Sequence, residues 1–285
     1  MSVGTESTSD PTRIVLVAGP VKASDKLGHH DYAAGCRTLA ELLSSAAGVE
    51  PIIAMDGWPA DESVLQNAAS LVFYDKGGGR QAFLAAPNRL AILERAARAG
   101  AGIVMIHQTL GFPAAHVEFG KGLLGGVYAP GASSRGHWKS EHQSFPVHPV
   151  TRGVEPWKIL DGWLNRIAFS DGLRGVVPLL WSGKRFAGSP DGGDDDIVAW
   201  AYERPGRGRS FAFTGLDAHS AWSHAGLRRL IVNGILWSAG VEVPETGFPV
   251  DIDEAVLRTY LTPRRSRLTI LPRKLWRRWT ASPRW

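Results

Sequence analysis

Short apolar segments alternate with helical segments along the N-terminal part of the chain, and this alternation limits the fold more than any other feature. Residues 13–19 and 102–107 are apolar runs that end at loop residues, which is typical of buried central strands. Residues 33–46 and 88–99 carry apolar side chains at helical spacing. Strands that alternate with helices predict an α/β protein with a doubly wound, mostly parallel sheet.

The same pattern continues to residue 244. Further strands are predicted at residues 49–55, 70–74, 176–181, 197–202 and 210–214, and further helices at residues 226–239 and 252–261. With 44% hydrophobic residues in 285, the chain can bury a substantial core.

The two ends of the chain differ from the part between them. Residues 1–12 are polar and lack the apolar region of a secretory signal, so we expect a flexible N-terminus. The sequence contains no run of about 18 apolar residues, so no membrane-spanning helix is predicted. Cys36 is the only cysteine, which excludes an intramolecular disulfide framework. These features together predict a cytoplasmic protein.

The net charge of +5 belongs to the C-terminal extension, residues 245–285. Of the 32 Lys and Arg residues, eight follow Pro263, which leaves 24 against 27 Asp and Glu and a net charge of −3 for the rest. Basic residues mixed with tryptophans can bind an anionic membrane surface or a nucleic acid. Packing of the extension on its own domain or on a neighbouring subunit is favoured here, because prolines interrupt any long amphipathic helix.

Ligands of open parallel sheets bind beyond the carboxyl ends of the strands. The polar residues and glycines expected at this edge are His29, His30, Asp31, Asp75, Lys76, Gly77, Gly78, Gly79, His107, Gln108, Thr109, Asp217 and His219. One histidine alone is more often structural than catalytic, but histidines from separate loops weaken that interpretation. We therefore predict His107, His219, His30 and Asp217 as catalytic, and we keep the structural interpretation for His29.

Two kinds of chemistry are disfavoured by the motifs. The glycines at 77–79 could let a ligand approach the backbone, but they match neither nucleotide-binding glycine motif, so no nucleotide is expected. Amidotransferase chemistry needs a nucleophile on a strand-to-helix turn. At that place the chain has His107, Gln108 and Thr109, and Cys36 lies within a predicted helix. The sequence therefore predicts that the protein is not a glutamine amidotransferase.

Several segments, taken in order, resemble the trehalose-utilisation (ThuA-like) family. They are His30-Asp31, Val72-Phe73-Tyr74 before the glycine run, residues 102–107, Leu124-Gly125-Gly126, His137-Trp138, residues 148–154, residues 198–204 and residues 227–244. The resemblance covers residues 13–244, which we take as one ThuA-like domain. It implies a flavodoxin-like sheet with the topology of class I glutamine amidotransferases.

The resemblance also implies a role in the metabolism of trehalose-like disaccharides or other glycosides. The expected reaction is proton abstraction next to the carbonyl of a keto sugar, of isomerase or lyase type, for which a base near neutral pKa and an electrophile are needed. The family-matching polar residues are His30, Asp31, His107, His137, Asp161 and His219. The substrate-binding set is predicted as Asp31, Lys76, Gly77, Gly78, Gly79, His137, Asp161 and Trp222.

The chain departs from the family pattern at three places. Gly162 stands where the family commonly has a glutamate, Asp217 where it has a histidine, and Arg80-Gln81 where it has a histidine after the glycine run. These changes keep two alternatives open, a non-catalytic sugar-binding or regulatory protein and a metal-dependent hydrolase. A divalent metal such as zinc would be held by His30, His107, His219 and Asp217. The expected partner is a small sugar or glycoside, and a homo-oligomer is left open.

Overall fold

A seven-stranded sheet forms the centre of the computed structural model, which describes residues 10–22, 25–186 and 193–263. The strand order is β2-β1-β3-β4-β11-β10-β9. The first five of these strands are parallel, and β10 and β9 add in antiparallel fashion. The bounds are β1 Thr12–Ala18, β2 Val49–Ala54, β3 Ser70–Tyr74, β4 Gly102–Ile106, β9 Val176–Trp181, β10 Ile197–Glu203 and β11 Arg209–Phe213. The predicted doubly wound, mostly parallel α/β sheet is confirmed.

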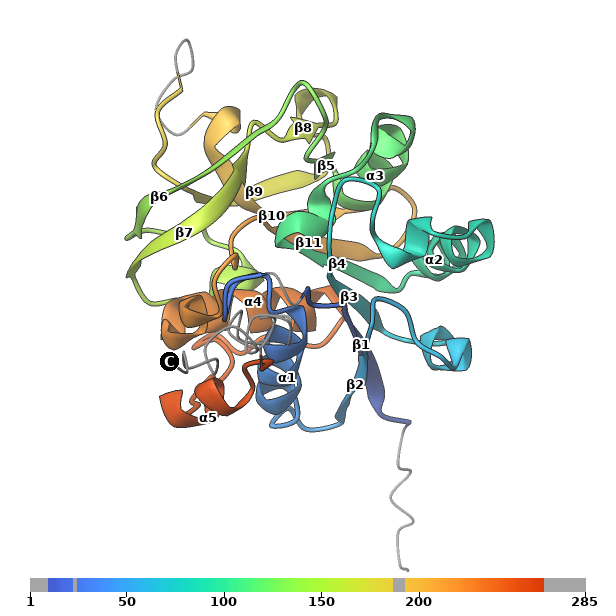
Figure 1. Ribbon diagram of the computed structural model, residues 1–285, viewed down its shortest axis with the longest axis horizontal. Helices are drawn as coiled ribbons and strands as arrows, with labels where there is room; N and C mark the ends of the chain where they lie inside the picture. The colour runs from blue at the N-terminus through green and yellow to red at the C-terminus, as the bar shows by residue number, and fades with distance from the viewer. Residues whose placement is uncertain (1–9, 23–24, 187–192, 264–285) are drawn as a thin grey trace, which may run out of the picture.

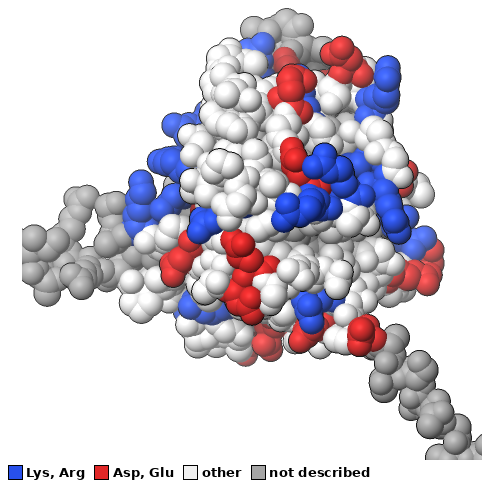
Figure 2. Space-filling model, turned by 90° about the vertical axis from the view of Figure 1, so that its right-hand side faces the viewer, with Lys and Arg blue, Asp and Glu red and all other residues white. Residues whose placement is uncertain are grey.

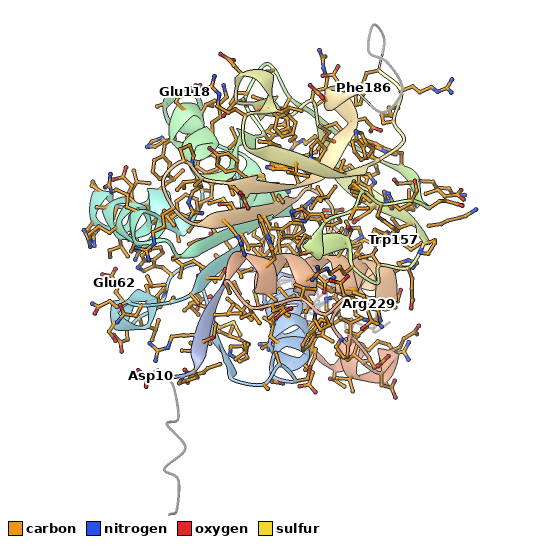
Figure 3. All side chains as sticks on the ribbon, turned by 180° about the vertical axis from the view of Figure 1, so that it is seen from behind. Asp10, Glu62, Glu118, Trp157, Phe186 and Arg229 are labelled. Carbon is orange, nitrogen blue, oxygen red and sulfur yellow. The ribbon has the colours of Figure 1, made fainter. Side chains whose placement is uncertain are left out.

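Helices cover both faces of this sheet (Figure 1). On one face α1 (Tyr32–Leu43) and α4 (Ala225–Ser238) pack on the apolar side chains of the strands, and on the other face α2 (Pro87–Ala99) and α3 (Val117–Leu124) do the same. A parallel strand with a helix layer on each side is buried on both faces, which explains the continuous apolar runs of β3 and β4. In Figure 3, Glu62 and Glu118 lie on one side of the sheet, and Trp157 and Arg229 lie on the other.

A long antiparallel hairpin stands beside the sheet and was not predicted. It pairs β6 (Ser134–His142) with β7 (Trp157–Asn165), so that His137 lies opposite Gly162. Two short strands, β5 (Gly126–Val127) and β8 (Ala168–Phe169), form a second small pair. The hairpin brings polar side chains toward the carboxyl edge of the sheet.

Short 3-10 helices fill most of the connections. Two of them follow sheet strands at the carboxyl edge, η3 (His107–Leu110) after β4 and η8 (His219–Ser223) after β11. The others are η1 Glu62–Leu65, η2 Ala82–Leu84, η4 Ala114–His116, η5 Pro149–Thr151, η6 Asp171–Leu173 and η7 Asp194–Asp196.

The chain after residue 244 packs on the same core as the family-like part. Arg228 of α4 donates to the carbonyl of Val250 at 2.8 Å, and Asn233 Oδ1 accepts from Phe248 N–H at 3.0 Å. The helix α5 (Glu254–Thr259) then buries Leu257. The expected basic tail from residue 264 onward and the expected flexible N-terminus up to residue 9 lie outside the described residues.

Lys and Arg side chains gather in a band across the face that carries α2 and α3 (Figure 2). Exposed Arg95 and Arg98 of α2 belong to this face. Positive charge is therefore concentrated locally within the described part of the chain as well, although acidic residues outnumber basic ones there by count. None of the helices in the described ranges is long and apolar enough to cross a membrane.

His142 of β6 makes the stability of this fold depend on pH. Its ring lies 4.7 Å from the ring of Trp157 and 5.7 Å from that of Trp163, between centroids. Burial lowers the pKa of His142 to about 4, against a smaller opposing effect of the Trp181 backbone. The unfolded chain takes up a proton below about pH 6.5 and the folded chain does not, so this stability is present above pH 6.5 and is lost as the pH falls toward 4.

We expect His142→Gln to remove that dependence. The free energy of unfolding of the native chain should fall about 2 kcal/mol more between pH 7 and pH 5 than that of the variant. Urea unfolding curves of both proteins at the two pH values measure the difference. Equal losses of unfolding free energy in the two proteins would show that His142 has the same pKa in the folded and the unfolded chain.

Candidate active site

Asp217 lies at the centre of the candidate site, in the loop that follows β11. Its side chain is almost fully buried, and four imidazoles surround its carboxylate. Oδ1 faces Nε2 of His30 at 2.6 Å and Nε2 of His107 at 3.3 Å. Oδ2 faces Nε2 of His137 at 2.9 Å and Nδ1 of His29 at 3.2 Å. The carboxylate thus has two sides, each with two histidines.

Asp217 is ionised in this surrounding. Burial by itself would raise the pKa of its carboxyl, but the neighbouring imidazoles of His107, His30 and His137 hold that pKa well below its usual range. A permanent negative charge at this place favours positive charge on the neighbouring imidazoles or on a bound cation.

Asp161 of β7 positions the loop that carries Asp217. Its Oδ2 accepts the N–H of Leu216 at 2.6 Å, and its Oδ1 accepts the N–H groups of Asp217 at 3.1 Å and Ala218 at 3.3 Å. Burial raises the pKa of Asp161, while the charge of His107 and these backbone donors lower it. Asp161, which was predicted to bind substrate, therefore contacts the backbone behind the cluster.

His107 is held by the end of the neighbouring strand. It follows β4 directly, has a positive φ of 56°, and its Nδ1 lies 2.9 Å from the carbonyl oxygen of Thr214. A carbonyl can only accept, so Nδ1 carries a hydrogen, and Nε2 has a lone pair whenever the ring is neutral. This buried Nε2 makes no hydrogen bond, although it lies near Asp217 Oδ1.

His30 reaches the cluster from the loop after β1. Its backbone N–H donates to the carbonyl of Asp217 at 2.9 Å, which ties the two loops together. The Nε2 of its ring also lies 2.9 Å from the amide Nε2 of Gln108, whose Oε1 accepts from the hydroxyl of Tyr32 at 3.2 Å. The Gln108 amide and the Asp217 carboxylate therefore both contact Nε2 of His30.

The residue His29, for which we expected a structural role, reaches the same carboxylate. His30 has a φ of 47°, in the left-handed region that few side-chain-bearing residues adopt. This turn of the backbone allows two adjacent side chains to face one group. Gln108 is a further residue that we did not assign to the site, although its position directly after His107 was the available signal.

A cavity of about 740 Å³ opens beside the cluster. Its walls include Asp217 and the four histidines, together with Gln108, Lys26, Arg135 and Trp163. The volume lies in the range of small-molecule sites, and its polar groups converge from separate loops. A sugar-sized ligand fits this description.

Gly162 leaves room for Asp217 at the wall of the cavity. A β-carbon at Gly162 would lie 2.8 Å from Cβ of Asp217 and 2.9 Å from Nε2 of His137. The two departures from the family pattern at positions 162 and 217 are therefore neighbours in space. The carboxylate at this place therefore belongs to Asp217 and not to residue 162.

Seven predicted site residues lie elsewhere, and His219, Asp31 and Trp222 are three of them. His219 faces α5 and a second cavity of about 530 Å³. Its Nε2 lies 3.0 Å from the carbonyl oxygen of Leu257. Asp31 caps α1 and accepts from the N–H and hydroxyl of Thr262. Trp222 is fully buried in the core. The structure therefore separates these three residues from the Asp217 carboxylate.

The glycine run and Lys76 also lie apart from the cavity beside Asp217. The N–H of Gly78 donates to the Gly111 carbonyl at 2.6 Å, and the N–H of Gly79 donates to Gln81 Oε1 at 3.0 Å. These donors are already used within the protein, so they do not form an anion-holding nest. Lys76 and Gly77 are not among the residues that line this cavity.

Among the described residues, one group of side chains has the spacing of metal ligands. Nε2 of His30, Nε2 of His107 and a carboxylate oxygen of Asp217 all lie within 4.8 Å of one another. His219, which we predicted as a fourth ligand, is not in this group.

The strand-to-helix turn after β4 holds His107 in place of a nucleophile. Cys36 is fully buried in α1, and burial raises the pKa of its thiol well above the ordinary value. A buried, protonated thiol is unreactive. Fold and site together define the class: an α/β protein with a doubly wound, mostly parallel sheet and a histidine and carboxylate cluster at the carboxyl edge of that sheet.

Comparison with known proteins gives the family. Residues 18–238 match the family model ThuA, described as trehalose utilisation, and the chain belongs to this family. The family description links it to carbohydrate metabolism. No curated protein matches the sequence.

Two solved structures of ThuA-like proteins resemble this fold. The one from Parabacteroides merdae aligns with a TM-score of 0.56 and 14% identity, over 82% of this chain and 92% of that one. The one from Bacteroides uniformis aligns with a TM-score of 0.58 and 13% identity, over 84% of this chain and 95% of that one. At such identities the likeness is one of fold.

Proposed function

We propose that this protein is an enzyme of carbohydrate metabolism that removes the proton next to the carbonyl of a keto sugar, as an isomerase or a lyase. The observation that carries the proposal is one buried, ionised carboxylate with four imidazoles at the wall of a cavity of about 740 Å³. Membership in the trehalose-utilisation family supports a sugar as the ligand.

His137 is the best placed general base. Its Nε2–H donates to Asp217 Oδ2 at 2.9 Å, so the carboxylate fixes the tautomer and leaves the lone pair on Nδ1. Its side chain is 64% exposed, which leaves that nitrogen accessible to a ligand. An imidazole paired with a carboxylate is a common arrangement for proton transfer near neutral pH.

The other side of the carboxylate supplies the electrophile. Loss of a proton next to a carbonyl places negative charge on the carbonyl oxygen, and positive charge near that oxygen lowers the barrier. His30 and His107 lie on the Oδ1 side of Asp217, and Lys26 and Arg135 line the same cavity. Base and electrophile would therefore act from opposite sides of one anchoring carboxylate.

The test is NMR of a 3-keto-glucoside in heavy water with the purified full-length chain. We expect deuterium to enter next to the carbonyl, or a new product to form, and we expect His137→Gln to slow this at least about 100-fold. His116→Gln, a change in η4 outside the cluster, is the matched control and should retain the native rate.

Other outcomes would replace the proposal. Binding of the keto sugar without exchange or conversion would indicate a sugar-binding or regulatory protein. Cleavage of the glycosidic bond without exchange would indicate a hydrolase.

A further inference from the structure

The Oδ1 side of Asp217 brings together three atoms that can each donate an electron pair, namely Nε2 of His30, Nε2 of His107 and Oδ1 itself. The Thr214 carbonyl forces the hydrogen of His107 onto Nδ1, which leaves a buried Nε2 that makes no hydrogen bond and points at the carboxylate. Nε2 of His30 lies between the Gln108 amide, at 2.9 Å, and Asp217 Oδ1, at 2.6 Å. Close approach of these atoms, at 2.6 Å and 3.3 Å from Oδ1, requires a positive charge among them, carried by a proton or by a metal ion that replaces it.

We propose that His30 Nε2, His107 Nε2 and Asp217 Oδ1 bind one divalent transition-metal ion, with Zn²⁺ as the best match. Zinc takes imidazole nitrogen at about 2.0–2.1 Å and carboxylate oxygen at about 2.0–2.2 Å. Atoms within 4.8 Å of one another reach such distances to a common ion after small side-chain rotations. Two imidazoles and one carboxylate with open positions form a ligand set of catalytic zinc sites.

The groups around the three proposed ligands are also arranged as expected for a metal site. The Thr214 carbonyl orients the ring of His107, as a second shell does for a metal-bound imidazole. Asp217 Oδ2 is already held by His137 and His29, so that Oδ1 remains for the ion. All three ligands line the cavity, which leaves the remaining coordination positions accessible to a ligand such as a sugar oxygen.

The proposal concerns the same cluster as the proposed function, but the experiment measures binding without turnover. The full-length protein is stripped with a chelator, and Zn²⁺ is added by calorimetric titration against a competing chelator. We expect one ion per chain, with release of protons. Mg²⁺ should not compete, because it prefers oxygen ligands. Co²⁺ should give the visible absorption of a site with nitrogen ligands.

Variants decide whether the ion lies at this cluster. His107→Gln and Asp217→Asn should each weaken Zn²⁺ binding at least about 100-fold, while His116→Gln retains native affinity. Circular dichroism of each stripped variant shows whether it is folded, and His30→Gln provides a third ligand variant should one of the first two fail to fold.

The outcomes separate this proposal from the proposed function. No saturable Zn²⁺ binding, or binding that is unchanged in the ligand variants, would overturn the metal site, and His30 would then be the protonated partner of Asp217. Tight binding at the cluster without isotope exchange would support the metal site and overturn the keto-sugar reaction. Exchange that continues in fully stripped protein would overturn a role of the metal in it.

Discussion

Asp217→Asn is expected to slow isotope exchange into a keto sugar by at least about 100-fold, while the protein stays folded. The amide has the shape of the carboxylate, but it removes the charge that four histidines share. It also gives His137 a partner that can donate, so the tautomer that leaves Nδ1 as the base is no longer enforced. The measurement is the exchange rate by NMR at saturating substrate.

A matched change elsewhere controls for loss of a carboxylate in general. Asp171 lies exposed in η6, and Asp171→Asn should leave the exchange rate unchanged. Thermal melting of both variants should show folded proteins. An Asp217→Asn rate within a factor of two of the native rate would exclude Asp217 from the reaction.

Asp161→Asn is expected to lower the free energy of unfolding by about 3 kcal/mol and to impair the reaction as well. The carboxylate of Asp161 is buried and accepts the backbone N–H groups of residues 162, 216, 217 and 218. An amide in its place turns an NH₂ group toward one of these donors, so a buried N–H loses its acceptor. The loop that carries Asp217 then loses its anchor. Urea unfolding measures the stability.

A positioning role predicts a second effect that a purely structural role does not. At a temperature where Asp161→Asn is fully folded, the turnover rate should still fall at least about tenfold, because His30 and His107 no longer meet a fixed carboxylate. Native turnover in the folded variant would limit Asp161 to a structural role. Asp171→Asn again serves as the control.

The central sheet was predictable because its strands are short, apolar and separated by helical patterns. β6 was missed because its sequence, SRGHWKSEH, contains few apolar side chains and no short turn joins it to β7. α3 was missed because it contains two glycines. Gly120 is required there, since a β-carbon would lie 2.7 Å from Val127 Cγ1 and 3.0 Å from the ring of Phe112. Tertiary packing therefore requires glycine at this position, although glycine has a low intrinsic helix propensity.

Three residues at the centre of the site were predictable because they follow the ends of sheet strands. His30, His107 and Asp217 follow parallel strands at one edge, so the pattern alone placed them near one another. His219 could not be excluded in this way, because η8 turns it toward α5 two residues after Asp217. The participation of His29 depends on the left-handed backbone of His30, which residue type does not reveal.

The residues after position 244 have a consequence for how this protein can diverge from its relatives. The family match ends at residue 238, yet Leu257 and Leu261 line the cavity behind His29. The backbone N–H and the hydroxyl of Thr262 also donate to the carboxylate of Asp31, the N-cap of α1. An appended segment therefore forms a wall next to the loop that carries two of the four histidines. Changes in the length or sequence of this segment would reshape that wall while every residue of the cluster stays the same.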